Sequence, residues 1–88
     1  MRCVLTIQNE KGLHARASAK FVDVVEAHDA SVTVSKDGYD VSGNSIMGLM
    51  MLGAAKDSQI EIEVTGPEAE KLATALEVLI DGKFGEGR

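Results

Sequence analysis

A histidine, an arginine and a glycine lie close together in the segment KGLHARASAK, residues 11–20. Imidazole nitrogens form covalent intermediates in group-transfer reactions. A guanidinium is planar and permanently charged, and its fork of donors suits phosphate oxygens. His14, with Arg16 two residues later, therefore favours the handling of a phosphoryl group. Gly12 supplies a turn that other residues would resist.

His14 lies at the boundary between a strand pattern and a helix pattern. Apolar residues alternate over residues 2–8, which predicts a strand. From about Arg16 the apolar period becomes helical and runs to near His28, which predicts a helix. The inward positions are Cys3, Leu5 and Ile7 in the strand and Ser18, Phe21, Val22 and Val25 in the helix. A helix N-terminus presents unpaired N–H groups and about half a positive charge, so a phosphoryl group on His14 would meet donors there.

The alternative is that His14 is an exposed loop residue without a chemical role. Motifs for hydrolysis are absent, because the sequence has no GxSxG, no P-loop and no paired carboxylate beside His14. His28 would lie roughly 20 Å away along the helix, so the two histidines are not expected to share a metal ion. The single cysteine, Cys3, is expected in the core and provides neither a disulfide nor a multi-thiolate site. We expect no metal and no cofactor, which sets aside a metal chaperone.

The rest of the chain predicts three more strands and two more helices. SVTVS (31–35) and DGYDVS form a hairpin around Asp37-Gly38, a short helix lies within 43–58 between Gly43 and Gly53, QIEIEV (59–64) is a strand, and a helix starts at Pro67. The order β-α-β-β-α-β-α predicts an α+β fold. We expect a two-layer open-faced sandwich, with a four-stranded antiparallel sheet, three helices on one face and water on the other.

Composition limits the class of protein. The chain has 88 residues, 44% of them apolar and 26% charged, so we expect residues 1–88 to form one domain. The net charge of −5 argues against nucleic-acid binding, which needs a basic face. No apolar run approaches the roughly 18 residues of a membrane span, and no signal-peptide pattern opens the chain. These two features lead us to expect a cytoplasmic protein. No long apolar stripe is left over once the core is assigned, so we expect a monomer.

The short helix carries a second set of candidate residues. Ser45 precedes it and is expected to cap its N-terminus through the hydroxyl oxygen. Leu49 and Leu52 are expected to face the sheet. Met47, Met50 and Met51 form a stripe on a different side, and a stripe of this kind is either core or an adaptable docking surface. Since the leucines already supply the core contacts, docking is favoured.

Three segments carry a family resemblance: GLHARASAKFV, NSIMGLMMLGAAKDSQIEI and TGPEAEKLATALEVLI. They resemble the HPr family of histidine-containing phosphocarrier proteins, which belong to the bacterial phosphoenolpyruvate-dependent phosphotransferase system. The resemblance implies the same β-α-β-β-α-β-α fold, phosphorylation of His14 on Nδ1 and neutralisation of the phosphate by Arg16. It also implies that Ser45 is a regulatory phosphosite for an HPr kinase/phosphorylase. The implied docking residues lie in the first helix and the short helix: Ala15, Ala17, Lys20, Ile46, Met47, Met50 and Met51.

By this resemblance the protein is a carrier rather than an enzyme. It would accept a phosphoryl group from an enzyme I-type kinase and pass it to a histidine of an enzyme IIA-type acceptor, in sugar uptake or in nitrogen or carbon regulation. Asp23 and Glu26 add acidity to the first helix and favour the nitrogen-related NPr branch. Ala17 stands where the family usually has proline, which would loosen the first turn slightly. The alternative is a regulatory binding domain that acts through its methionine-rich helix.

Overall fold

The computed structural model describes residues 1–88 and contains the predicted order of elements. The strands and helices are β1 (Arg2–Thr6), α1 (Ala15–Glu26), β2 (Ser31–Lys36), β3 (Tyr39–Ser42), α2 (Ile46–Met51), β4 (Gln59–Thr65) and α3 (Ala69–Asp81), followed by a 3₁₀ turn, Lys83–Gly85. The order β-α-β-β-α-β-α is confirmed. None of the helices combines the length and apolar character needed to span a membrane.

Four antiparallel strands form one sheet in the order β1-β4-β2-β3. The last strand in the sequence, β4, therefore lies between the first two, with Cys3 and Val34 on either side of Ile62. β2 and β3 form the predicted hairpin, and both turn residues have positive φ, 51° at Asp37 and 84° at Gly38. The β1–β4 pairing also places the loop after β1 beside the segment that leads into β4.

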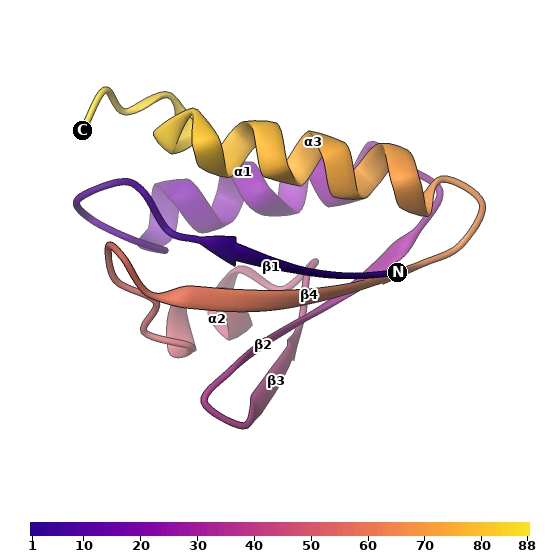
Figure 1. The fold of residues 1–88 in the computed structure, drawn as a ribbon, viewed down its shortest axis with the longest axis horizontal. Helices are drawn as coiled ribbons and strands as arrows, with labels where there is room; N and C mark the ends of the chain where they lie inside the picture. The colour runs from indigo at the N-terminus through magenta and orange to yellow at the C-terminus, as the bar shows by residue number, and fades with distance from the viewer.

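Helices α1 and α3 lie side by side over one face of the sheet (Figure 1). The short helix α2 contacts α1 and the edge strand β3. The alternation of β4 is confirmed, since Ile60, Ile62 and Val64 are buried while the residues between them are exposed or half-buried. The helical stripe of α1 is confirmed as well: its predicted inward positions, including Ser18, are buried. This shared core holds α1 at a defined place against the sheet.

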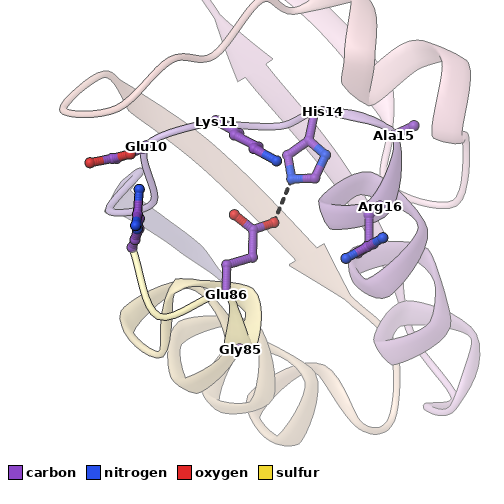
Figure 2. Close-up of a pocket in the computed structure, with 8 residues that line it drawn as sticks. Glu10, Lys11, His14, Ala15, Arg16, Gly85 and Glu86 are labelled. Atoms are coloured by element: carbon purple, nitrogen blue, oxygen red, sulfur yellow. Dashed lines mark hydrogen bonds and ion pairs between the residues drawn. The ribbon is translucent and has the colours of Figure 1, made fainter.

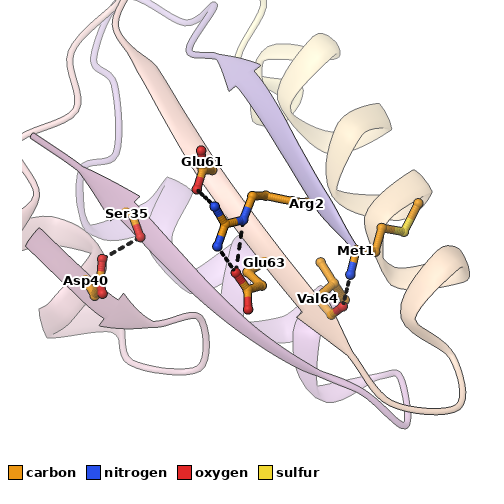
Figure 3. A network of polar contacts seen from close by, with 7 residues as sticks. All are labelled: Met1, Arg2, Ser35, Asp40, Glu61, Glu63 and Val64. Carbon is orange, nitrogen blue, oxygen red and sulfur yellow. Dashed lines mark hydrogen bonds and ion pairs between the residues drawn. The ribbon is translucent and has the colours of Figure 1, made fainter. Parts of the chain in front are cut away.

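The other face of the sheet is polar. Arg2 forms ion pairs with Glu61 and Glu63 across β1 and β4, and Ser35 donates a hydrogen bond to Asp40 across the hairpin (Figure 3). The hydrogen bond from the guanidinium to Glu63, together with the charges of both glutamates, raises the pKa of Arg2. The expectation that one face meets water is therefore confirmed.

Candidate functional site

The loop that carries His14 is held in place by backbone contacts to the segment before β4. Gly12 has a φ of +63°, and a Cβ at this position would lie 2.2 Å from the carbonyl oxygen of Ala54. Leu13 is buried, and its N–H donates to the same oxygen at 3.0 Å. Only glycine combines this conformation with this close approach. These contacts of Gly12 and Leu13 therefore fix the position of the backbone at His14.

His14 is the N-cap residue of α1, with extended backbone angles, φ −76° and ψ −179°. Its carbonyl oxygen accepts from the N–H of Ser18 at 2.9 Å, but its side chain makes no capping hydrogen bond. The N–H groups of Ala15, Arg16 and Ala17 have no backbone or side-chain acceptor. The N-terminus of α1 is therefore an open set of donors beneath the imidazole, with the positive end of the helix dipole added to it.

Ala17 requires a correction. The side chain was expected to dock partners, but Ala17 is fully buried beneath the first turn, so this prediction is wrong. The residue lies on the inward stripe of α1, one position before Ser18. Its relevance to the site is its backbone: a proline would lack the N–H that alanine keeps among the open donors.

The imidazole of His14 contacts a carboxylate from the opposite end of the chain. Its Nε2 pairs with Oε2 of Glu86 (Figure 2). Oε1 of the same carboxylate accepts from Nδ2 of Asn9 at 2.9 Å. Burial opposes ionisation of Glu86, but the hydrogen bonds from Asn9 and His14 and the charges of His14 and Lys11 outweigh it. The pKa of Glu86 is therefore lower than usual.

Charged side chains surround this pair in a surface hollow. Lys11, Arg16 and Arg88 supply positive charge, and Glu10 joins Glu86 in supplying negative charge. Arg16 is exposed, and its guanidinium makes no hydrogen bond or ion pair. It lies on the side of the hollow formed by the first turn of α1 (Figure 2). The site therefore presents a free planar cation beside a half-exposed imidazole, an arrangement suited to a phosphoryl group.

Sequence reasoning missed Asn9 and Glu86, which make the contacts to the imidazole and its partner, as well as the charged residues Glu10, Lys11 and Arg88 of the hollow. Asn9 is completely buried although polar, and Glu86 follows a helix whose periodic pattern ends near Ile80. One signal was available, because Phe84 after that helix indicates that the tail packs against the protein. Nothing in the sequence, however, places Glu86 against a histidine 72 positions earlier.

The short helix α2 lies near the same site and exposes its methionines. The predicted cap is confirmed: Oγ of Ser45 accepts from the N–H of Gly48 at 3.0 Å. Leu49 and Leu52 are buried, as expected. The exposed apolar residues of the helix are Ile46, Met47, Met50 and Met51, of which Met47 and Met51 are 70% and 80% exposed. A second, shallow hollow is lined by both His14 and Met50, so the histidine and one methionine of α2 share one surface.

Two other expectations concern Lys20 and metal binding. Lys20 is half-buried, and its Nζ donates to the carbonyl oxygen of Phe84 at 2.6 Å, so its ammonium group already has a partner within the chain. No three His, Cys, Asp or Glu side chains come together in a group that could hold a metal ion. The candidate chemistry therefore depends on His14, Arg16 and the donors of α1.

Comparisons with known proteins identify the family. The family described as "PTS HPr component phosphorylation site" matches residues 1–81. Phosphocarrier protein HPr of Neisseria meningitidis is 48% identical over 83 residues, which cover 94% of this chain and 93% of that protein. Phosphocarrier protein NPr of Escherichia coli is 38% identical over 81 residues, which cover 91% of this chain and 90% of that protein.

A solved structure agrees with these sequence matches. The crystal structure of HPr-C-His from Thermoanaerobacter tengcongensis has a TM-score of 0.93 and 36% identity, and the match covers 98% of this chain and 97% of that one. The predicted α+β fold with a four-stranded antiparallel sheet and three helices is thereby confirmed. The matches support a phosphocarrier role in the phosphotransferase system. The chain belongs to the HPr family of phosphocarrier proteins.

Proposed function

We propose that this protein accepts a phosphoryl group on Nδ1 of His14 from an enzyme I-type kinase charged by phosphoenolpyruvate. It then donates the group to a histidine of an enzyme IIA-type acceptor. The observation that carries this proposal is the open N-terminus of α1 beneath His14, where the N–H groups of the first turn have no acceptor. A phosphoryl group on the ring would supply that acceptor.

The geometry supports transfer rather than hydrolysis. Nε2 of His14 already contacts Glu86, so Nδ1 is the nitrogen left for phosphorus. Arg16 lines the same hollow without a partner, which supports a role in neutralising the incoming charge, because phosphoryl transfer requires positioning and charge neutralisation more than covalent chemistry from the protein. The imidazole side chain is 29% exposed, so a partner's active site can reach it.

Mass spectrometry tests this proposal directly. The protein is incubated with phosphoenolpyruvate and enzyme I-type kinases of the sugar and nitrogen branches, beside His14→Ala and His28→Ala variants. We expect wild type and His28→Ala to gain one acid-labile phosphoryl group and His14→Ala to gain none. Absence of the group from wild type with every kinase would overturn the proposal. The faster of the two kinases would identify the branch, for which the exposed Asp23 and Glu26 favour nitrogen regulation.

The exposed side of α2 and the start of α1 form the proposed docking surface: Ala15, Lys20, Ile46, Met47, Met50 and Met51. Ala15 lines the hollow of His14 and Glu86, the α2 residues are exposed, and Lys20 is half-buried and donates to the carbonyl oxygen of Phe84. We expect Met47→Lys to weaken binding of both relay partners without altering the fold. Binding at wild-type affinity would exclude this surface.

We also propose that the protein works as a monomer, which light scattering during size-exclusion chromatography would test.

Ser45 is proposed as a regulatory phosphosite for an HPr kinase/phosphorylase-type partner. Its residue is half-buried, and its hydroxyl already accepts from Gly48 at the N-terminus of α2. A phosphate there is electrostatically compatible with the helix, while its charge would lie beside the methionines that dock partners. Ser45→Asp is expected to keep the fold and weaken docking, and partner affinity equal to wild type would contradict this.

A regulatory binding domain remains the second candidate, because Met51 is the most exposed large apolar residue of the chain and Met47, on the same short helix, is 70% exposed. Such a domain would bind its target through α2 whether or not His14 can carry a phosphoryl group. Retention of every cellular role by a His14→Ala variant would favour this second function. Loss of those roles would favour the carrier.

A further inference from the structure

The segment after α3 turns back over the site. Lys83 and Phe84 have φ values of 56° and 55°, a conformation that residues with side chains rarely adopt. Two contacts maintain it: Phe84 is buried in the core, and its carbonyl oxygen accepts from Nζ of Lys20 on α1. The reversal brings Glu86 to the His14 loop and leaves its side chain only 13% exposed.

Both oxygens of this carboxylate have assigned partners. Asn9 donates through Nδ2 to Oε1 of Glu86 and to the carbonyl oxygen of Gly12, each at 2.9 Å. Two acceptors around Nδ2 fix the orientation of the amide, and Oδ1 of Asn9 is left buried without a partner. An unpaired buried acceptor is unfavourable. Asn9 therefore holds the Glu86 carboxylate in place although its own Oδ1 has no hydrogen-bond donor. In this position Oε2 of Glu86 is directed at His14.

We propose that Glu86 is a positioning residue: its carboxylate holds the proton of the neutral His14 ring on Nε2 and keeps the lone pair on Nδ1. A carboxylate can only accept, so the nitrogen that it contacts must carry the proton. Figure 2 shows the other ring nitrogen on the side that faces the start of α1. The nitrogen with the lone pair is thus the one nearest the open donors. This inference rests on the proposed function of His14.

The electron and proton balance follows from this arrangement. Nδ1 donates its lone pair to phosphorus, and the bond from phosphorus to the donor kinase breaks with its electron pair remaining on the kinase. The ring then carries phosphorus on Nδ1 and a proton on Nε2, and this cation lies against the Glu86 carboxylate. When the group moves to the acceptor, the N–P electron pair returns to Nδ1 and the ring is neutral again. The Nε2 proton stays in place throughout both transfers.

The chain offers a matched control and an internal reference. Glu10 lines the same hollow and carries the same charge, but makes no contact with the imidazole. Lys11, Arg16 and Arg88, the remaining charged groups of the hollow, are unchanged in the variants. His28 is the reference, because its Nδ1 lies 2.7 Å from the carbonyl oxygen of Val24, which can only accept. Its proton should be on Nδ1, opposite to that of His14.

Nitrogen-15 NMR of the histidine rings at about pH 8.5, where an imidazole is ordinarily neutral, tests the proposal without any kinase. The proteins are wild type, Glu86→Gln, Glu86→Ala and the control Glu10→Gln, with the backbone spectrum reporting the fold. We expect His14 of wild type and Glu10→Gln to show a single Nε2–H tautomer with a slowly exchanging proton. Both Glu86 variants should lose that protection and, in Glu86→Ala, the tautomers should mix, while His28 keeps its Nδ1–H pattern in every protein.

Phosphorylation supplies the second measurement. Glu86→Gln is expected to accept the group from the enzyme I-type kinase roughly three- to tenfold more slowly, as for loss of one charge-assisted hydrogen bond, and Glu10→Gln at nearly the wild-type rate. An Nδ1–H tautomer in wild type, or ring signals unchanged in Glu86→Ala, would overturn the role of Glu86 even if wild type is phosphorylated. A wild type that is never phosphorylated, with the expected ring signals, would instead overturn the proposed function.

Discussion

The N-termini of α1 and α2 have different N-cap residues, and only the side chain of the α2 cap accepts a hydrogen bond from the first turn of its helix. Ser45 caps α2 with its own hydroxyl oxygen, so the N–H of Gly48 has an acceptor within the chain. His14 occupies the equivalent position on α1, yet its ring points to Glu86 and leaves the first-turn N–H groups without an acceptor. One helix end is closed for stability, and the other is open to an anion.

This difference shows what the choice of cap residue does. A serine cap satisfies donors and stabilises a short helix that has little else to support it. A histidine in the same place gives up that hydrogen bond, and α1 tolerates the loss because five of its twelve residues are buried against the sheet and α3. The unused donors become available for a group that arrives on the histidine itself.

The largest expected effect comes from closing the open end. His14→Ser should abolish phosphoryl acceptance because no nitrogen remains, while its hydroxyl should make it about 1 kcal/mol more stable than His14→Ala. Mass spectrometry after incubation with the kinase and urea unfolding of both variants are the measurements. Equal stability of the two variants would show that the α1 terminus is not available for capping.

Arg16 is the next test, because it adds the only unpaired charge on the first turn. Arg16→Ala should slow phosphoryl acceptance roughly 10- to 100-fold, the cost of a lost hydrogen bond to a charged group. Arg2→Ala, on the outer face of the sheet, removes the same charge far from His14 and should leave the rate unchanged. Equal slowing in both variants would mean that net charge, and not the position of Arg16, controls the reaction.

At the capped N-terminus of α2, a substitution should change the stability of the protein and not the rate of phosphorylation. Ser45→Ala removes the acceptor of the Gly48 N–H and should lower the free energy of unfolding by about 1 kcal/mol. Phosphorylation of His14 should continue at the wild-type rate. Ser42→Ala is the control, because its hydroxyl bonds only to exposed Asn44, and its effect should be within about 0.5 kcal/mol. A slowed phosphorylation in Ser45→Ala would mean that the two termini are coupled.

The smallest effect is a dependence of stability on pH. The pKa of Glu86 is lower in the folded state, so its contribution to stability is present above the unfolded value, about 4.3, and is lost as pH falls through the folded value. Wild type should therefore be more stable than Glu86→Gln near neutral pH, and the difference should shrink below about pH 4. Urea unfolding at several pH values measures it. A difference that grows on acidification would contradict the assigned sign.

Most of the fold and one side of the site follow from local sequence patterns. The period of two in β4, the helical stripe of α1 and the Asp37-Gly38 turn were all predicted, because alternation, helical spacing and turn chemistry act over a few residues. The same locality places His14 at the start of a helix, with Arg16 beside it. Ser45 as a cap follows from the same rules.

Long-range packing decided the rest. Ala17 satisfies the spacing of a first-turn docking residue, but the angle at which α1 meets the sheet buries it completely. Because β4 pairs between β1 and β2, the segment before β4 lies against the loop after β1, and Ala54 and Ala55 leave no room for a side chain at Gly12.

By itself, the sequence determined that His14 stands at the start of a helix beside Arg16, which is the basis for proposing it as the phosphoryl carrier. Only the tertiary structure decided that Glu86 contacts His14, because this contact joins opposite ends of the chain. It depends on the turn at Phe84, which the core holds in place, and on the buried amide of Asn9. No local rule connects residues so distant, since their meeting depends on how the whole core packs.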